Sequence, residues 1–367
     1  MSGEDRPPVA VVTGAAGQDG FYLTRRLLED GYVVHGTIRR ERATDTSATA
    51  SIDSAVILHE LDLEEPSGHA RLIADLRPDE FYNLAGMSSV AASFVDPAAA
   101  WRTNANAVEA MLDAVRDDSP ATRFYQASTS EMFGWEPGKD AVHDESSPLR
   151  PQSPYAAAKA AAHLMCGAHR GAYDLRIACG ILFNHESSRR PASFLTRKVV
   201  DHVRALRAGP AAAGRRTPPL AMGNMAAKRD WGFAPDYVDG MRRIIGQVEV
   251  RATVRGGPQE EDRGASYRDY VLGTGRLHAV WELVDRAFEL AGFPLDWDLA
   301  GEPSGWSACF RGTSRVAVTV DPAFIRPVDP PAIRADASRA RTELGWTPRR
   351  GLDPFLREML GEDAREP

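Results

Sequence analysis

Cysteine is scarce in this chain of 367 residues. Only Cys166, Cys179 and Cys309 occur, an odd number, widely spaced and without a C-x-x-C pattern. This excludes a disulfide framework and a cysteine zinc site as organising features. We expect the three thiols to behave as small buried side chains.

Long apolar runs are also absent. No uninterrupted stretch could form a membrane helix, and the opening residues 1–8 are polar and lack the apolar core of a signal peptide. A net charge of −7 and a pI near 5.8 argue against a nucleic-acid partner. We therefore expect a cytoplasmic protein with no membrane partner, and the hydrophobic content of 43% suffices for a large core.

Lysine is rare as well. Of 44 basic residues other than histidine, only Lys139, Lys159, Lys198 and Lys228 are lysines. Arginine has a planar fork that stays charged, so it replaces a compact, titratable ammonium poorly. The remaining lysines therefore indicate positions where an ammonium group is needed.

Apolar runs typical of strands alternate with segments of helical periodicity in the first half of the chain. The expected strands are 9–12, 32–38, 55–58, 80–84, 123–127 and 175–182, and the expected helices are 21–29, 68–76, 98–117 and 154–173. This alternation predicts an α/β fold with a doubly wound parallel (Rossmann) sheet covered by helices on both faces.

The pattern is less regular after residue 183. We expect a helix over 189–207, a linker over 208–219 and a polar loop over 254–266. The predicted organisation is a cofactor-binding domain over 1–185, to which segments near 233–247 and 270–280 return, and a smaller mixed domain over 186–367 that binds substrate.

A glycine-rich turn separates the first strand from the first helix. Gly14, Gly17 and Gly20 form G-x-x-G-x-x-G. Glycine allows the backbone to approach a pyrophosphate closely, and the N-terminus of the following helix attracts its charge. The pattern alone could be a simple glycine turn, but its place in the first βαβ unit predicts a dinucleotide site.

The end of the second strand indicates which dinucleotide is bound. Proteins that bind NAD usually carry an acidic residue there, whereas this chain has Arg39 and Arg40. Guanidinium groups suit a 2′-phosphate, so NADP is favoured, although two solvated arginines remain the alternative. Asp62 and Leu63 are expected at the adenine, and the segment from Leu84 to Ser88 beside the cofactor.

Four side chains suggest redox chemistry coupled to proton abstraction. Tyr155 and Lys159 lie four apart in an expected helix, where the ammonium should lower the pKa of the phenol. Thr129 and Glu131 follow the fifth strand and should meet them at the same sheet edge. A carboxylate there could remove a proton next to a transient ketone and so promote loss of water. The alternative is a core tyrosine and a helix-capping carboxylate.

A basic loop follows the sixth strand. The segment 184–198 contains three arginines and Lys198, which suggests a clamp for a diphosphate. Asn224, Arg229 and Arg326 add polar and cationic groups from the second half of the chain. His185 has no partner at metal-ligand spacing, so we expect no metal site.

Several segments together resemble the GDP-mannose 4,6-dehydratase family of the extended short-chain dehydrogenase/reductases, over nearly the whole chain. They are TGAAGQDG (13–20), IRR (38–40), FYQASTSEMFG (124–134), SPYAAAK (153–159), GILFNHES (180–187), FLTRK (194–198), AKRDWGFAPDYV (227–238) and ELGWTP (343–348). The NHES and KRDWGFAPDYV segments are far more specific than the glycine turn.

The resemblance implies an enzyme that converts GDP-mannose, or a related nucleotide sugar, to a 4-keto-6-deoxy product with tightly bound NADP. Tyr155, assisted by Lys159, would take the C4 hydroxyl proton, Thr129 would bond the C4 oxygen, and Glu131 would take the C5 proton before water leaves from C6. Further cofactor contacts are implied for Gln18, Asp19, Leu84, Ser88, His185 and Arg190. Substrate contacts are implied for Ser130, Asn184, Lys198, Asn224, Arg229 and Arg326.

The chain departs from the family at several positions. Gly86, Met87 and Ser89 interrupt the usual AAQSHV or GAQSHV segment, Ala99 replaces a tyrosine, and Asp329 replaces a glutamate. The segment 41–54 lacks the serine-rich loop through which the family forms tetramers, so we expect a homo-oligomer and leave dimer and tetramer open.

Two other functions stay open at this point. One is a dehydratase or epimerase of the same family acting on a different nucleotide sugar. The other is a non-catalytic NADP-binding sensor, which would need none of the four catalytic candidates.

Overall fold

The computed structural model describes residues 6–39, 52–136, 142–213, 217–255 and 261–362. Its largest element is a parallel sheet of seven strands in the order β12-β7-β5-β4-β1-β2-β3. These strands are β1 (Val9–Thr13), β2 (Val33–Ile38), β3 (Ile57–Glu60), β4 (Glu80–Asn83), β5 (Arg123–Thr129), β7 (Ile177–Leu182) and β12 (Tyr270–Leu272).

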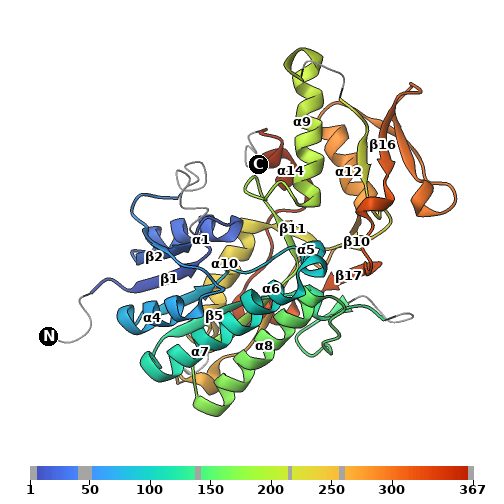
Figure 1. Cartoon of the computed structure of the whole chain (residues 1–367). Helices are drawn as coiled ribbons and strands as arrows, with labels where there is room; N and C mark the ends of the chain where they lie inside the picture. Colours follow the sequence, from blue (N-terminus) through green and yellow to red (C-terminus); the bar gives the residue numbers. More distant parts are fainter. Residues whose placement is uncertain (1–5, 40–51, 137–141, 214–216, 256–260, 363–367) are drawn as a thin grey trace.

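Helices cover both faces of this sheet (Figure 1). One layer contains α1 (Gln18–Glu29) and α10 (Ala234–Ile245), and the other contains α4 (Pro66–Leu76), α7 (Ala107–Asp118) and α8 (Pro154–Tyr173). Each layer buries its own apolar cluster against the sheet. The expected doubly wound α/β fold is confirmed.

The strand order reverses between β1 and β4, which is where open parallel sheets bind ligands. The candidate residues after β1, β4 and β5 therefore lie around one crevice. The chain crosses this edge again after β7, in β8 (Asn184–Glu186), which pairs with β11 (Trp231–Phe233).

A third apolar cluster lies beside the sheet, at the upper right of Figure 1. It is built from α9 (Leu195–Ala213), α12 (Val280–Leu290), α14 (Leu352–Met359) and the mixed sheet β14-β15-β16-β9. The strands of that sheet are β9 (Leu220–Met222), β14 (Leu295–Asp298), β15 (Ser307–Phe310) and β16 (Val316–Val320).

Short elements complete the described chain. The strands are β6 (Val142–His143), β10 (Lys228–Arg229), β13 (His278–Ala279) and β17 (Ala332–Ala335), which form one small sheet. The helices are α5 (Val90–Val95), α6 (Pro97–Trp101), α11 (Gln247–Arg255) and α13 (Ser338–Leu344), with 3₁₀ turns η2 (Ser130–Met132), η3 (Gly264–Ser266), η4 (Pro303–Gly305) and η5 (Pro322–Phe324).

Four expected elements differ from the structure. The helix expected over 98–117 is divided by a π-helical turn, η1 (Arg102–Asn106). The helix expected from 189 begins only at Leu195, after Pro191, and the linker expected from 208 is partly helical, with a kink where Gly209 has a φ of 73°. The loop expected from 254 begins inside α11.

No helix in the part of the chain that the structure describes is long and apolar enough to span a membrane.

Candidate active site

The catalytic candidates meet at the carboxyl end of β5. The Thr129 hydroxyl accepts the N–H of Glu131 at 3.3 Å, which starts the turn η2. Ser153 caps α8 by accepting the N–H of Ala156 at 3.1 Å, and this puts Tyr155 in the first turn of the helix. The Thr129 hydroxyl also lies near the phenol of Tyr155, and its proximity lowers the pKa of that phenol.

The Tyr155 phenol is buried, and burial raises its pKa to about 12. The Glu131 carboxylate also raises the pKa, whereas the Thr129 hydroxyl and the Arg190 guanidinium lower it. We expected the Lys159 ammonium to lower the pKa of Tyr155, and for the protein alone this expectation was wrong. Burial dominates, and Lys159 is not among the groups that shift the pKa of this phenol.

Lys159 lies one helical turn further along α8. Its Nζ donates to the carbonyl of Ala127 at 3.1 Å. Burial lowers the pKa of this amine to about 8. The amine can therefore exchange a proton near neutral pH, which arginine could not do.

The glycine turn has the geometry that a pyrophosphate requires. Gly14 has a φ of 72°, and a Cβ on Gly20 would lie 2.3 Å from the Gly14 carbonyl oxygen. Gly17 caps α1 without a side-chain hydrogen bond, so the first N–H groups of that helix remain available for an anion. The described residues of this turn fit a dinucleotide.

Gln18 and Asp19 bond to the protein itself. Gln18 donates to the carbonyl of His185 at 3.1 Å and accepts from Ser187 at 3.0 Å, and Asp19 Oδ2 lies 2.9 Å from His185 Nε2. Burial lowers the pKa of His185, but the Asp19 carboxylate outweighs this and the net shift is upward. The pKa of Asp19 is lowered because His185 and Arg190 outweigh its burial.

A buried ion pair that the sequence did not suggest lies next to His185. Glu186 Oε2 is 3.1 Å from Arg190 Nε, and the Glu186 side chain is only 2% exposed. Burial raises the pKa of Glu186 against the lowering effects of Arg190 and of a hydrogen bond from Thr196. Its place inside the NHES segment was the only signal in the sequence.

The arginine expected to bind substrate phosphate is already paired. Arg229 donates to Asp329 at 2.5 Å and to the carbonyls of Pro330 and Lys228 at 2.7 and 2.9 Å. Asn224 donates to the other oxygen of Asp329 at 3.2 Å. Lys198, whose Nζ lies 3.4 Å above the ring of Phe324, and the exposed Arg326 are therefore better placed to receive phosphate charge.

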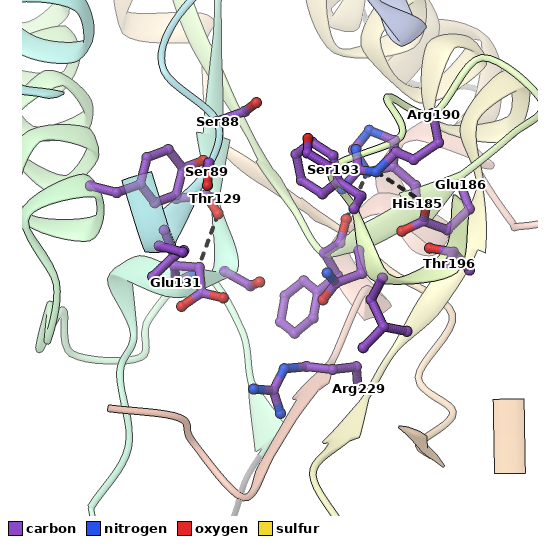
Figure 2. A pocket seen from close by; sticks show the side chains of 18 of the residues that line it. Ser88, Ser89, Thr129, Glu131, His185, Glu186, Arg190, Ser193, Thr196 and Arg229 are labelled. Carbon is purple, nitrogen blue, oxygen red and sulfur yellow. Dashed lines mark hydrogen bonds and ion pairs between the residues drawn. The ribbon is translucent and has the colours of Figure 1, made fainter. Parts of the chain in front are cut away.

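These groups enclose a pocket of about 400 Å³. Figure 2 shows Thr129 and Glu131 on one wall, His185, Glu186 and Arg190 on the opposite wall, and Arg229 below. The expected site residues that line the pocket are Asp19, Leu84, Ser88, Thr129, Ser130, Glu131, Tyr155, Lys159, Asn184, His185, Arg190, Lys198, Asn224, Arg229 and Arg326.

The residues expected at the adenosine end lie outside this pocket. Arg39 is exposed at the end of β2, whereas Arg40 lies outside the described residues. Asp62 accepts the N–H of Glu64 at 2.9 Å, and the side chain of Leu63 is buried in the core. Leu63 could therefore contact adenine only through its backbone.

Four of the five departures from the family pattern line the pocket, and one of these, Asp329, lies against Arg229. Gly86, Met87 and Ser89 line the pocket, whereas Ala99 is buried in α6 outside it. A Cβ on Gly86 would lie 2.3 Å from Asn104 Oδ1, and Asn104 donates to the carbonyl of Met87 at 3.1 Å. The side chain of Asn104 thus occupies space that a larger residue at 86 would need.

Among the residues that the structure describes, one group of side chains could supply metal ligands. His163, Cys179 and Asp269 place ligand atoms within 4.8 Å of one another. Both oxygens of Asp269 accept from Arg170, at 2.7 and 2.8 Å, and one also accepts from the Cys179 N–H. This carboxylate is saturated by hydrogen bonds, which argues against its use as a metal ligand.

Comparison with known proteins gives one consistent family. The family model described as GDP-mannose 4,6 dehydratase matches residues 11–359. GDP-mannose 4,6 dehydratase 1 of Arabidopsis thaliana is 38% identical over 97% of this chain and 89% of its own length. The GDP-mannose 4,6 dehydratase of Homo sapiens is 35% identical over 97% of this chain and 91% of its own.

Solved structures with the same fold are more distant in sequence. The dTDP-glucose 4,6-dehydratase of Bacillus anthracis in complex with NAD has a TM-score of 0.72 and 19% identity, over 97% of this chain and 96% of its own. RMD from Pseudomonas aeruginosa, complexed with NADPH, has a TM-score of 0.68 and 20% identity, over 97% and 98%. Such low identity supports the fold alone.

Proposed function

The chain belongs to the GDP-mannose 4,6-dehydratase family of nucleotide-sugar hydro-lyases, and from this premise we propose that it converts GDP-mannose to GDP-4-keto-6-deoxymannose with bound NADP. The observation that carries the proposal is that Tyr155 and Lys159 line the same pocket as Thr129 and Glu131, whose carboxylate follows Thr129 in the turn η2. Simple hydride transfer needs no such carboxylate.

NADP suits the described part of the cofactor site. The turn at Gly14–Gly20 can receive a pyrophosphate, and the exposed Arg39 at the end of β2 can meet a 2′-phosphate. Bound there, NADP would supply a hydride acceptor for C4 and the matching hydride donor for C6.

Three protein groups would handle the protons. Thr129 donates to the C4 oxygen, and Tyr155 takes the C4 hydroxyl proton as the C4–H bond breaks. Glu131 then removes the C5 proton, which the C4 ketone has made acidic, and passes it to the C6 oxygen as the C6–O bond breaks. Water leaves and a double bond forms between C5 and C6.

The remaining steps balance the reaction. After hydride has added to C6, C5 takes a proton from solvent in place of the one that left with the water, and the double bond between C5 and C6 is gone. The substrate has lost one water and the cofactor is unchanged. Lys159, with its pKa lowered by burial to about 8, can restore the proton balance of Tyr155 between turnovers.

The cationic side chains at the end of the pocket expected to bind the nucleotide suit a diphosphate. Lys198 and Arg326 form no ion pair with a carboxylate of the described residues, whereas Arg229 is neutralised by Asp329. We assign the first two to the phosphates and Asp329, fixed by Arg229 and Asn224, to the polar groups of the nucleoside.

A second candidate is a dehydratase of this family that acts on a different nucleotide sugar. The observation that favours it is the wall formed by Gly86, Met87 and Ser89, which departs from the family segment. Methionine in place of glutamine removes both a donor and an acceptor next to the reacting groups.

A panel of nucleotide sugars tests both candidates. Purified protein is incubated with GDP-mannose, GDP-glucose, dTDP-glucose and UDP-glucose, and the products are analysed by mass spectrometry. We expect loss of one water from GDP-mannose. Loss of water only from another member would favour the second candidate, and unchanged masses throughout would exclude a dehydratase acting on these sugars.

A further inference from the structure

The segment 321–329, which connects β16 to β17, lines one end of the pocket. At its start the Asp321 N–H donates to the carbonyl of Met222 at 2.7 Å. At its end Asp329 accepts from Arg229 at 2.5 Å. Both ends of the segment are therefore fixed to the pocket wall. Its lining residues are Phe324, Arg326 and Asp329.

Phe324 presents an aromatic ring to the pocket between these two anchors. Its backbone is closely packed, since a Cβ on Gly223 would lie 2.4 Å from the Phe324 carbonyl oxygen. The residue as a whole is nevertheless 51% exposed. The backbone thus fixes the place of Phe324, while the ring offers a planar apolar surface to a ligand.

The Lys198 ammonium already lies against this ring. Its Nζ is 3.4 Å from the centroid of the Phe324 ring, within the range of a cation–π contact. Lys198 belongs to the first turn of α9 and is one of the two cations that we assign to the phosphates of the substrate. The N–H donors of the ammonium that are turned to the ring are not available to a phosphate. The ring and a phosphate therefore compete for Lys198.

We propose that Phe324 is a specificity-determining residue: its ring screens Lys198 from phosphates that carry no nucleobase, and it stacks on the nucleobase when a nucleotide sugar binds. The inference rests on the proposed function, because it takes the diphosphate of that substrate as the ligand of Lys198. Arg326 and Asp329, which we assign to the phosphates and the nucleoside, lie on the same segment as the ring.

The two contacts of the ring change ligand affinity in opposite directions. The contact with Lys198 is given up when a phosphate binds, which weakens the binding of every phosphate ligand. Stacking strengthens only the binding of ligands that carry a base. A penalty on the wrong ligand combined with a gain for the right one is a general basis of specificity. The ring therefore favours nucleotide sugars over inorganic phosphates and sugar phosphates.

Calorimetric titration of Phe324→Leu tests both contacts. Leucine keeps an apolar side chain at this half-exposed position but has no aromatic face. Pyrophosphate should bind about threefold more tightly than to wild type, because Lys198 is no longer screened. GDP should bind about threefold less tightly, because a loss of stacking on the order of tenfold outweighs that gain.

Three results of this titration would overturn the proposal. Pyrophosphate that binds to the variant no more tightly than to wild type would refute the screening of Lys198. GDP that binds to the variant as tightly as to wild type would refute the stacking. Wild type that binds neither ligand would refute both.

Phe310→Leu is the matched control. Phe310 also lies below a cation, with the Arg315 guanidinium carbon 4.6 Å from its ring centroid, but it does not line the pocket. Its replacement should leave the affinities for pyrophosphate and GDP unchanged. Equal changes in the two variants would show that the effect comes from stability alone and would refute the role of Phe324.

A double variant tests whether the ring acts on phosphates through Lys198. Lys198→Met should weaken the binding of pyrophosphate, and adding Phe324→Leu should not restore any of the lost affinity, because the screened cation is gone. The same gain from Phe324→Leu with and without Lys198 would contradict the proposal.

NMR follows the contact between the ring and the ammonium directly. The chain has only four lysines, so protein labelled with ¹³C-lysine gives few Cε signals. The signal of Lys198, assigned from its loss in Lys198→Met, should show an upfield shift of its Cε protons by the ring current of Phe324. This shift should vanish in Phe324→Leu and on addition of pyrophosphate or GDP. A shift that persists with either ligand bound would refute the competition.

The inference and the proposed function fail separately. If wild type dehydrated no sugar of the panel, the proposed function would be refuted, while the titrations and the NMR shift would still decide the role of Phe324. If wild type were active but Phe324→Leu bound pyrophosphate no more tightly, only the inference would be refuted.

Discussion

His185 Nε2 lies 2.9 Å from Asp19 Oδ2, so the strand that follows β7 is bonded to the first turn of α1. The other ring nitrogen, Nδ1, lies 2.7 Å from the carbonyl oxygen of Phe183. Both nitrogens thus face acceptors, which suits an imidazolium ring paired with a carboxylate. This contact couples the wall that carries Glu186 and Arg190 to the turn that would receive the cofactor.

The contact predicts a pH-dependent loss of stability in Asp19→Asn. Asp19 raises the pKa of His185 above its usual 6.5, and His185 lowers the pKa of Asp19 below its usual 3.8. The charged pair therefore stabilises the fold at pH values between the two shifted pKa values. The variant should lose about 1–3 kcal/mol of unfolding free energy near pH 5 and less near pH 8. Urea denaturation at both pH values measures this, and equal losses would contradict it.

The assignment of Glu131 as the base predicts the behaviour of Glu131→Gln. Water loss should fall by at least about a thousandfold, because the other carboxylates among the described lining residues, Asp19, Glu186 and Asp329, belong to other segments, while NADP is retained since Glu131 is not at the glycine turn. Product mass and the amount of bound cofactor measure the two effects. Turnover near the wild-type rate would mean that another group removes the C5 proton.

The close packing of Gly86 against Asn104 predicts that a substitution at one position restores the stability lost by a substitution at the other. Gly86→Ala places a methyl group 2.3 Å from Asn104 Oδ1 and should cost about 1–3 kcal/mol of stability by displacing that side chain. Asn104→Ala in the same protein should recover most of this loss. Thermal unfolding of the four proteins of the cycle measures the coupling, and simple additivity would show that the two side chains do not compete.

The exposed Arg39 predicts cofactor preference. Arg39→Ala should weaken NADP on the order of tenfold and leave NAD almost unchanged, because only NADP carries the 2′-phosphate. Calorimetric titration of cofactor-free protein with each dinucleotide compares them. Equal weakening would remove the support that Arg39 gives to NADP.

The positions of the motifs could be predicted from the sequence because they depend on local rules. A glycine turn after a strand and a tyrosine that opens a helix are local patterns, and the alternation of elements brings their ends to one sheet edge. Thr129, Glu131, Tyr155 and Lys159 therefore line one pocket, as the spacing indicated.

Partners from distant segments could not be predicted in this way. Arg229 looked like a free cation because nothing in the sequence shows that Asp329 would neutralise it. The rise in the pKa of Tyr155 depends on burial by many elements, and the π-helical turn at Asn104 depends on packing against α8. Glu186 was overlooked because its partner, Arg190, is four residues further along the chain but lies in a loop. That spacing indicates a contact only within a helix.

Deuterium transfer from C4 to C6 tests the central claim most directly. GDP-mannose labelled with deuterium at C4 is converted by the purified protein, and the product is analysed by mass spectrometry and NMR. The account predicts a product that has lost one water and carries the deuterium in its C6 methyl group, in a protein to which no free cofactor was added. A product of unchanged mass, or a dehydrated product without deuterium at C6, would contradict it.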